Sequence, residues 1–186
     1  SLGLVGSEMC IRDRPNGQAQ QGLLRGALQD ASVQARVISL NEAHGTGTAL
    51  GDPIEAGSLA AALLAEQRAG DALVCGGIKE SLGHGESTAG VSGLLRLALG
   101  LASGEAPPNG QLRTLNPHVR GATRGTPSVM PCQAAMGRVV VDVQEAEIGG
   151  VSSFGYSGTI AHAVLAFGIV EGCSAFAFGR DPDASE

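Results

Sequence analysis

The sequence is poor in aromatic residues and in lysine. Aromatic residues make up 3% of its 186 residues and tryptophan is absent, so the core must be built from Ala, Leu, Val and Ile. Lys79 is the only lysine, and the other eleven basic residues are arginines. The net charge is −6 and no basic cluster is present, so binding to nucleic acid is not predicted. No apolar run reaches the about 20 residues of a membrane span, so none is expected.

Cysteines with metal-binding or disulfide spacing are also lacking. Cys10, Cys75, Cys132 and Cys173 are scattered without a CxxC pair, so neither a zinc site nor a disulfide framework is indicated. We therefore expect no metal and a reducing compartment. The cytoplasm is the expected location, and an organelle stays open because the native N-terminus is expected to be missing.

A glycine-rich turn with one histidine occupies residues 41–51, Asn-Glu-Ala-His-Gly-Thr-Gly-Thr-Ala-Leu-Gly. It follows the β-branched run 37–40, which predicts a buried strand, and it precedes a predicted helix with Asp52 as N-cap. Such a turn places His44 at the edge of a sheet, where α/β proteins often bind their ligands.

A second segment repeats this arrangement at residues 76–90. The apolar run 72–75 predicts a strand, and the turn after it carries Lys79 and His84 before another predicted helix. The single lysine stands five residues before the histidine. This position favours a compact ammonium, whose pKa shifts more readily than that of a guanidinium.

Five ordered motifs resemble those of the β-ketoacyl synthases of polyketide and fatty-acid synthesis. Their order and spacing cover residues 15–166. The motifs are Pro15-Asn16-Gly17 with Gln20, Glu42–Thr48 with Gly51–Glu55, Lys79 with Gly83-His84 and Ala89-Gly90, Leu115–His118, and Ser153–Thr159 with Ala161-His162. The chain departs from the family pattern at Glu80 and Ile160.

The resemblance implies a thiolase-like α/β fold, with stacked α/β layers and a mixed sheet, of which this chain is mainly the C-terminal half. Residues 15–167 would form that part of the ketosynthase domain. Residues 1–14 match nothing and are interpreted as a junction or assembly scar, and residues 168–186 as an unpatterned polar tail. Helices are predicted at 16–32, 53–69 and 87–103, the last of them apolar almost all round and therefore buried. A long connection, 104–136, and strands at 137–143, 148–154 and 159–167 follow.

The implied activity is that of an acyltransferase, the decarboxylative Claisen condensation of an acyl thioester with malonyl-carrier protein. His44 and His84 would stabilise the enolate as hydrogen-bond donors, and Lys79 would set the charge around them. His118 and His162 are interpreted as structural. The resemblance implies that substrate is bound by Thr46, Thr48, Phe154, Gly155, Tyr156 and Ser157.

The nucleophilic cysteine of the family lies in an Ala-Cys-Ser-type turn, and the sequence contains no such turn. The chain alone is therefore predicted to be inactive. The implied partners are an acyl carrier protein with its phosphopantetheine arm and, for the intact parent, a second copy in a homodimer. The chain itself is expected to bind no cofactor. The alternative is a non-catalytic relative, decarboxylase-like or similar to a chain-length factor, that acts as a scaffold. The acyl chain, and the choice between polyketide and fatty-acid pathways, stay open.

Overall fold

The fold is built on a five-stranded mixed sheet in the order β4-β2-β1-β6-β7. A computed structural model describes residues 15–66, 72–133, 135–136, 147–155 and 158–168. Three strands, β1 (Ile38–Glu42), β2 (Leu73–Gly76) and β6 (Glu147–Phe154), form the centre of the sheet and run parallel. At one edge β4 (Ser128–Val129) pairs parallel to β2, and at the other β7 (Ile160–Phe167) pairs antiparallel to β6. The predicted strands near 37–40, 72–75, 148–154 and 159–167 are thus present.

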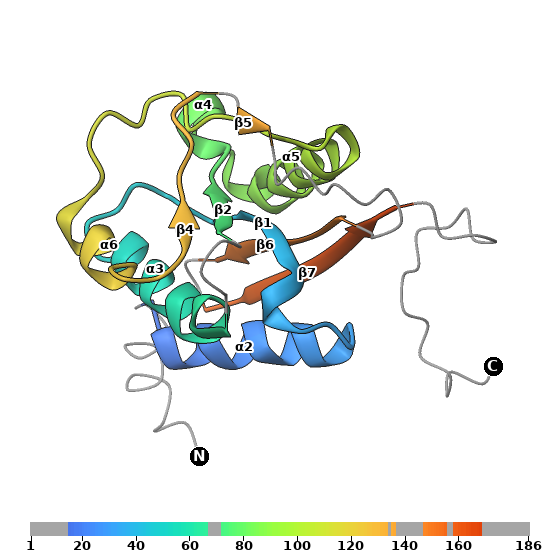
Figure 1. Cartoon of the computed structure of the whole chain (residues 1–186). Helices are drawn as coiled ribbons and strands as arrows, with labels where there is room; N and C mark the ends of the chain where they lie inside the picture. Colours follow the sequence, from blue (N-terminus) through green and yellow to red (C-terminus); the bar gives the residue numbers. More distant parts are fainter. Residues whose placement is uncertain (1–14, 67–71, 134, 137–146, 156–157, 169–186) are drawn as a thin grey trace, which may run out of the picture.

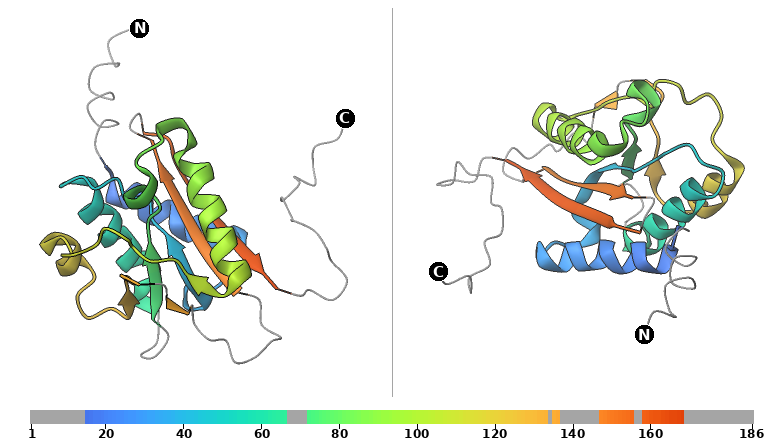
Figure 2. Two further views of the ribbon diagram at one scale, coloured as in Figure 1. Left: turned by 90° about the horizontal axis from the view of Figure 1, so that it is seen from above. Right: turned by 180° about the vertical axis from the view of Figure 1, so that it is seen from behind.

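Helices cover both faces of this sheet, as Figures 1 and 2 show. On one face α2 (Gly17–Asp30) packs against α3 (Gly51–Ala62) and β7. On the other face α5 (Ala89–Ser103) packs on β6, β1 and β7. These three helices correspond to the three predicted ones. No helix among the described residues is long and apolar enough to cross a membrane.

The ends of the helices follow from local hydrogen bonds. The Asn16 side chain caps α2 by accepting from the N–H groups of Gln18 and Ala19. The helix α3 ends at Ala62 and is followed by a short 3₁₀ turn, η2 (Leu64–Glu66), so it is shorter than predicted. A 3₁₀ turn before β1, η1 (Ala35–Val37), and another before α5, η3 (Glu86–Thr88), complete the main layers.

The long connection after α5 contains short elements of its own. β3 (Glu105–Ala106) pairs with β5 (Ala135–Met136) in a separate two-stranded sheet, and α6 (Pro117–Ala122) lies between them in the chain. α6 packs on α3. The expected strand at 137–143 and the segments 1–14 and 169–186 lie outside the described residues.

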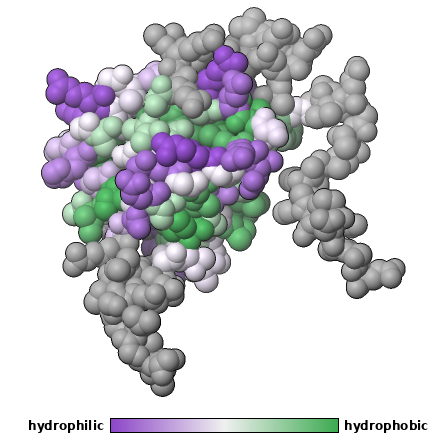
Figure 3. Space-filling model, turned by 90° about the horizontal axis from the view of Figure 1, so that it is seen from below, coloured by the Kyte–Doolittle hydropathy of each residue, from purple (hydrophilic) through white to green (hydrophobic). Residues whose placement is uncertain are grey.

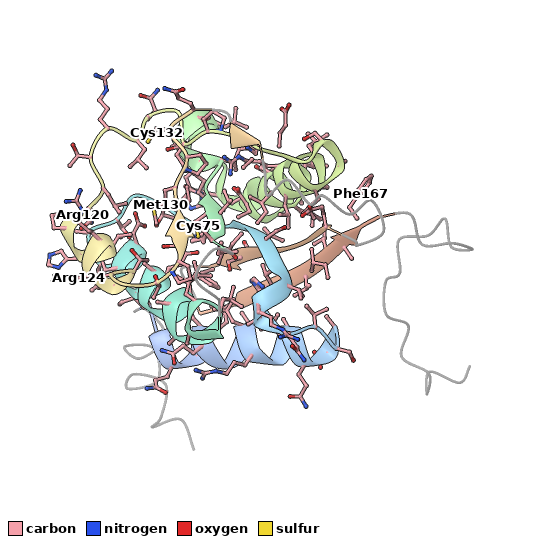
Figure 4. All side chains as sticks on the ribbon, viewed as in Figure 1. Cys75, Arg120, Arg124, Met130, Cys132 and Phe167 are labelled. Carbon is pink, nitrogen blue, oxygen red and sulfur yellow. The ribbon has the colours of Figure 1, made fainter. Side chains whose placement is uncertain are left out.

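The core is aliphatic, as the composition predicts. One cluster fills the space between α2, α3 and the sheet: Leu28, Ala35, Ile38, Leu59, Leu63, Leu64, Leu73 and Cys75, with Met130 packed against it. A smaller cluster of Leu97, Leu101 and Val151 lies between α5 and the sheet. Figure 4 shows Cys75 and Met130 next to each other on β2 and beside β4. Full burial of one such leucine stabilises the fold by about 1.5–3 kcal/mol.

The prediction that α5 is buried all round was wrong. Leu97 and Leu101 face the sheet, but Val91, Leu95 and Leu99 are 60%, 59% and 70% exposed. They lie four residues apart, so they form one stripe along the helix. Only one side of a helix can contact a single sheet, and this stripe faces away from it. We call Val91, Leu95 and Leu99 the α5 stripe.

The opposite side of the molecule has a different surface. Figure 3 shows the side on which α2 lies, where a band of hydrophilic side chains runs between apolar areas. The α2 helix is amphipathic, with Leu24 and Leu28 buried and Arg25 exposed. An outer face of that kind is normal for a helix in contact with water. The α5 stripe is not, because adjacent exposed apolar side chains usually mark a contact surface.

We expect the isolated chain to self-associate through the α5 stripe. Leu95→Gln with Leu99→Gln should raise the fraction of monomer in size-exclusion chromatography with light scattering, at little cost in stability because neither side chain is buried. Val37→Gln is the matched control, since Val37 is exposed but lies outside the stripe. Equal self-association of the double variant and the unchanged chain would contradict the expectation.

Candidate active site

Three parallel strands end at the same edge of the sheet. β1 ends at Glu42, β2 at Gly76 and β6 at Phe154, and their registers place Glu42 beside Gly76 and Val151. The segments after these ends carry His44 from one strand and Lys79 and His84 from another. Parallel pairing therefore brings together side chains that are 40 residues apart, as expected for the carboxyl edge of an α/β sheet.

The two histidine rings are in contact. The ring centroids of His44 and His84 are 5.6 Å apart with an interplanar angle of 86°, and Phe154 lies 5.7 Å from His44 on another side. His44 is 9% exposed, whereas His84 is exposed. The His44 Nδ1 atom is buried and has no hydrogen-bond partner among the described residues. A buried polar atom without a partner costs free energy, so such an atom indicates a place where a ligand or another chain contributes.

The surroundings of His44 keep its ring neutral. Burial is the largest cause and lowers its pKa to about 4, and the positive charges of Lys79 and His84 act in the same direction. A neutral imidazole carries one N–H donor and one acceptor nitrogen. At neutral pH His44 can therefore donate one hydrogen bond without bringing a full charge into the site.

Lys79 is a buried cation, with 8% of its surface exposed, at the start of the short helix α4 (Lys79–Leu82). Burial lowers its pKa, while the negative charges of Glu55 and Glu42 raise it and offset part of this effect. No carboxylate in the described part of the chain forms an ion pair with it. The ammonium thus lies between two carboxylates that stabilise its charge from a distance.

Glu55 holds the His44 turn, a role that the sequence did not suggest. Its carboxylate accepts hydrogen bonds from the N–H of His44 at 2.6 Å and of Gly45 at 2.9 Å. Burial raises its pKa to about 7, against the opposing effect of these two hydrogen bonds. Spacing alone could have given a hint, because an acidic residue in the first turns of α3 lies near the turn that precedes the helix.

The rest of the turn is closed by side-chain contacts. The Thr48 hydroxyl accepts from Gly51 N–H at 3.0 Å and lies 3.4 Å from the hydroxyl of Thr46. A Cβ at Gly51 would lie 2.4 Å from the Thr48 hydroxyl, so a side chain does not fit there. The expected substrate contacts of both threonines stay predictions, and the structure gives Thr48 a contact within the turn.

Asp52 is not the N-cap of α3, contrary to the prediction. The helix begins at Gly51, with Leu50 in the cap position, and Asp52 lies in the first turn. Its carboxylate accepts from Gly47 N–H at 3.1 Å instead. The side chain therefore ties the helix to the histidine turn, because the tight turn brings the Gly47 amide within its reach.

The glycine loop after β6 is only partly described. Phe154 contacts His44, and Gly155 N–H donates to Thr159 O at 2.6 Å, which closes the loop. Tyr156 and Ser157 lie outside the described residues. The expectation that Gly155, Tyr156 and Ser157 line the acyl entrance stays a prediction.

The remaining histidines and cysteines lie elsewhere. His118 is exposed on α6. His162 on β7 lies 3.0 Å from the Ser152 hydroxyl, and burial lowers its pKa to about 4. Cys75 is buried with its pKa raised to about 12 by burial, and Cys132 is exposed near α4 in Figure 4. Among the described residues no three potential metal ligands lie close enough together to hold an ion.

We expect His44 to stay neutral between about pH 5 and pH 8. Its lowered pKa means that protonation is disfavoured in the fold, so its contribution to stability falls as the pH drops below the ordinary value of 6.5 towards about 4. NMR of ¹³C-labelled histidine in the Leu95→Gln, Leu99→Gln chain would follow this, with His44→Ala to assign the signal. A titration midpoint for His44 near its ordinary value would contradict the expectation.

Comparison with known proteins gives a consistent result. A family model described as "Beta-ketoacyl synthase, C-terminal domain" matches residues 6–113. A phenolphthiocerol/phthiocerol polyketide synthase of Mycobacterium tuberculosis is 38% identical over 156 residues, which are 81% of this chain and 8% of that protein. The match of the family model begins within residues 1–14, and the expected boundary at residue 15 stays a prediction.

Solved structures with the same fold are ketosynthases. The oxazolomycin ketosynthase domain of Streptomyces albus has a TM-score of 0.76 at 31% identity and covers 84% of this chain and 27% of that one. The ketosynthase from module 6 of the bacillaene synthase of Bacillus subtilis has a TM-score of 0.76 at 28% identity, covering 86% and 29%. The expected thiolase-like α/β fold is confirmed, and the chain spans less than a third of each of these two domains. The chain therefore belongs to the β-ketoacyl synthase family and contains the C-terminal domain of a ketosynthase.

Proposed function

We propose that this chain is part of a ketosynthase that catalyses decarboxylative Claisen condensation in polyketide biosynthesis. The observation that carries the proposal is the contact between His44 and His84 at the carboxyl edge of the sheet, with a buried His44 nitrogen that has no partner among the described residues. The polyketide synthases among the relatives support the polyketide pathway over fatty-acid synthesis.

The reaction needs donors at one oxygen. When the malonyl thioester loses carbon dioxide, the electron pair of the broken C–C bond moves to the α-carbon and onto the thioester oxygen as an enolate. An N–H from each of His44 and His84 would stabilise that oxygen, and one such donor contributes a factor of about 10²–10³ in rate. The α-carbon then attacks the carbonyl of the acyl group on a cysteine, a new C–C bond forms, and the cysteine leaves as thiolate.

The nucleophilic cysteine would come from a segment that this sequence does not contain. Cys75 is unsuited because it is buried and its raised pKa keeps it as a thiol, whereas the thiolate is the reactive form. Cys132 is exposed on the loop after β4, away from the histidine pair. The chain by itself is therefore proposed to be inactive.

The proposed partners follow from the same chemistry. An acyl carrier protein would present the acyl and malonyl thioesters on its phosphopantetheine arm, and the complete ketosynthase would be a homodimer in the cytoplasm. Lys79 would hold positive charge beside the developing enolate. Phe154, which contacts His44, supports the expectation that the glycine loop lines the acyl entrance.

A hybrid ketosynthase tests the roles of the histidines. Residues 15–167 replace the corresponding part of the bacillaene module 6 ketosynthase, and two steps are measured separately: acylation by an acyl thioester, and decarboxylation of malonyl-carrier protein. His44→Ala and His84→Ala should each lower decarboxylation by about 100-fold or more, because each removes one donor to the enolate oxygen. Acylation should persist, since it does not form that enolate.

Two controls belong to this experiment. His118→Gln changes an exposed histidine on α6 and should leave decarboxylation within about threefold. The chain without the other half should form no acyl adduct by mass spectrometry. Normal decarboxylation by His84→Ala would show that the second histidine has been assigned wrongly. Decarboxylation without condensation in the hybrid would favour the decarboxylase-like alternative.

Lys79→Arg should also damage the hybrid although the charge is kept. The Lys79 side chain is buried beside a tight turn, and a planar guanidinium needs more room and a fixed set of acceptors. We expect a fall of about tenfold in decarboxylation, the cost of a modest displacement in an active site. Steady-state assay of the purified hybrid measures it, and unchanged turnover with Lys79→Arg would contradict the proposed need for an ammonium.

A further inference from the structure

A buried ion pair lies next to the site. Glu42 at the end of β1 and Arg96 on α5 form this pair, with 2% and 9% of their side chains exposed. The Glu42 carboxylate also accepts from Ile78 N–H at 2.7 Å. Burial raises the pKa of Glu42, and the positive charge of Arg96 acts against this. A buried pair is weak evidence for stability, because desolvation offsets most of the attraction. Its value must therefore be sought in what it positions.

Arg96 joins three parts of the chain. Besides Glu42, its Nη2 atom donates to Pro107 O at 2.9 Å and to Pro108 O at 3.3 Å. The guanidinium fork thus fixes the loop after β3 against the end of β1. Only Arg presents several donors in one rigid plane, and this geometry uses both arms of it.

Asn109, the next residue in that loop, holds the adjacent backbone. Its Oδ1 accepts from Gly77 N–H at 3.2 Å, and its Nδ2 donates to Cys75 O and to Pro131 O, both at 3.1 Å. The N–H groups of residues 77 and 78, immediately before Lys79, are therefore both bound by side chains from other elements.

Contacts in the opposite direction complete the arrangement. The Glu80 carboxylate accepts hydrogen bonds from the backbone N–H groups of Gly110 and Gln111. Glu80 is the residue at which the sequence departs from the family pattern. The loop 107–111 and the turn 77–82 thus bind each other through side chains on both sides.

Glycines make room for the ion pair. A Cβ at Gly76 would lie 2.4 Å from Arg96 Nη1, and one at Gly93 would lie 3.3 Å from Glu42 Cγ. The first distance is too short for any side chain. The backbone of β2 and of α5 therefore approaches the pair as closely as it can, which fixes the position of both charged groups.

We infer that Arg96 and Asn109 are positioning residues, which hold Ile78 and Gly77 and thereby set Lys79 and His84 in place relative to His44. The inference rests on the proposed function, because it assigns to these residues a part in the decarboxylation step. It extends the site beyond the histidine turns to a loop that carries no catalytic group. Neither Arg96 nor Asn109 contacts the substrate in this assignment.

The hybrid ketosynthase distinguishes positioning from general stability. Arg96→Met and Asn109→Leu should each lower decarboxylation by about tenfold or more, because displacement of a donor by a fraction of an ångström is costly in an active site. Acylation should stay within about threefold, since it does not depend on the two histidines. Arg124→Met is the matched control, an exposed arginine at the end of the α6 region in Figure 4.

A double variant separates position from charge. Arg96→Met leaves Glu42 buried without its partner and lowers the melting temperature, whereas Glu42→Gln with Arg96→Met removes both charges and should recover it. Decarboxylation should stay low in the double variant, because the loop 107–108 is still released. Recovery of decarboxylation together with stability would overturn the inference, as would an equal fall in acylation and decarboxylation or no fall in either.

Crystal structures of the hybrid and of its Arg96→Met variant give a readout that does not depend on activity. The inference expects the turn 79–82 and the His84 ring to shift relative to His44, and an unchanged turn would overturn it. If the unchanged hybrid lacks decarboxylation, the proposed function fails, while the two structures still decide whether Arg96 positions the turn.

Discussion

The parallel pairing of β1 between β2 and β6 is the constraint on which the site depends. The register places Asn41 beside Cys75 and Gly150, and Glu42 beside Gly76 and Val151. Because side chains alternate along a strand, a shift of one residue would turn the buried side of β1 outward. It would also move His44 away from His84. The hydrophobic clusters on the two faces of the sheet therefore fix the register, and the register fixes the distance between the two histidines.

Buried charges are held around this edge by hydrogen bonds rather than by ion pairs alone. Glu55 binds two backbone N–H groups of the His44 turn, and Glu42 binds Ile78 and Arg96. A carboxylate removed from water needs such partners, because an unpaired buried charge is strongly destabilising. The same low-dielectric surroundings lower the pKa of His44 to about 4. The site thus combines a neutral donor with fixed charges whose positions do not have to change during the reaction.

Much of this organisation could be predicted from the sequence. Apolar runs and glycine turns located β1, β2, α3 and α5, and the spacing of the two histidine motifs identified the family. Two predictions failed for physical reasons. Asp52 binds the turn before its helix, which depends on how tightly that turn folds. The α5 stripe is exposed because a single sheet covers one side of the helix, and composition cannot show how many layers surround it.

The sequence by itself determined which residues carry the chemistry, since His44, Lys79 and His84 stand in turns that local pattern and motif spacing identify. It also determined that the core is aliphatic and that no Ala-Cys-Ser-type turn is present. Only the tertiary structure decided that His44 and His84 lie 5.6 Å apart, that Glu55 holds the first turn, and that Arg96 with Asn109 holds the second. These contacts join residues far apart in the chain, and they form because the packed sheet and helices exclude water from groups that must then bind one another.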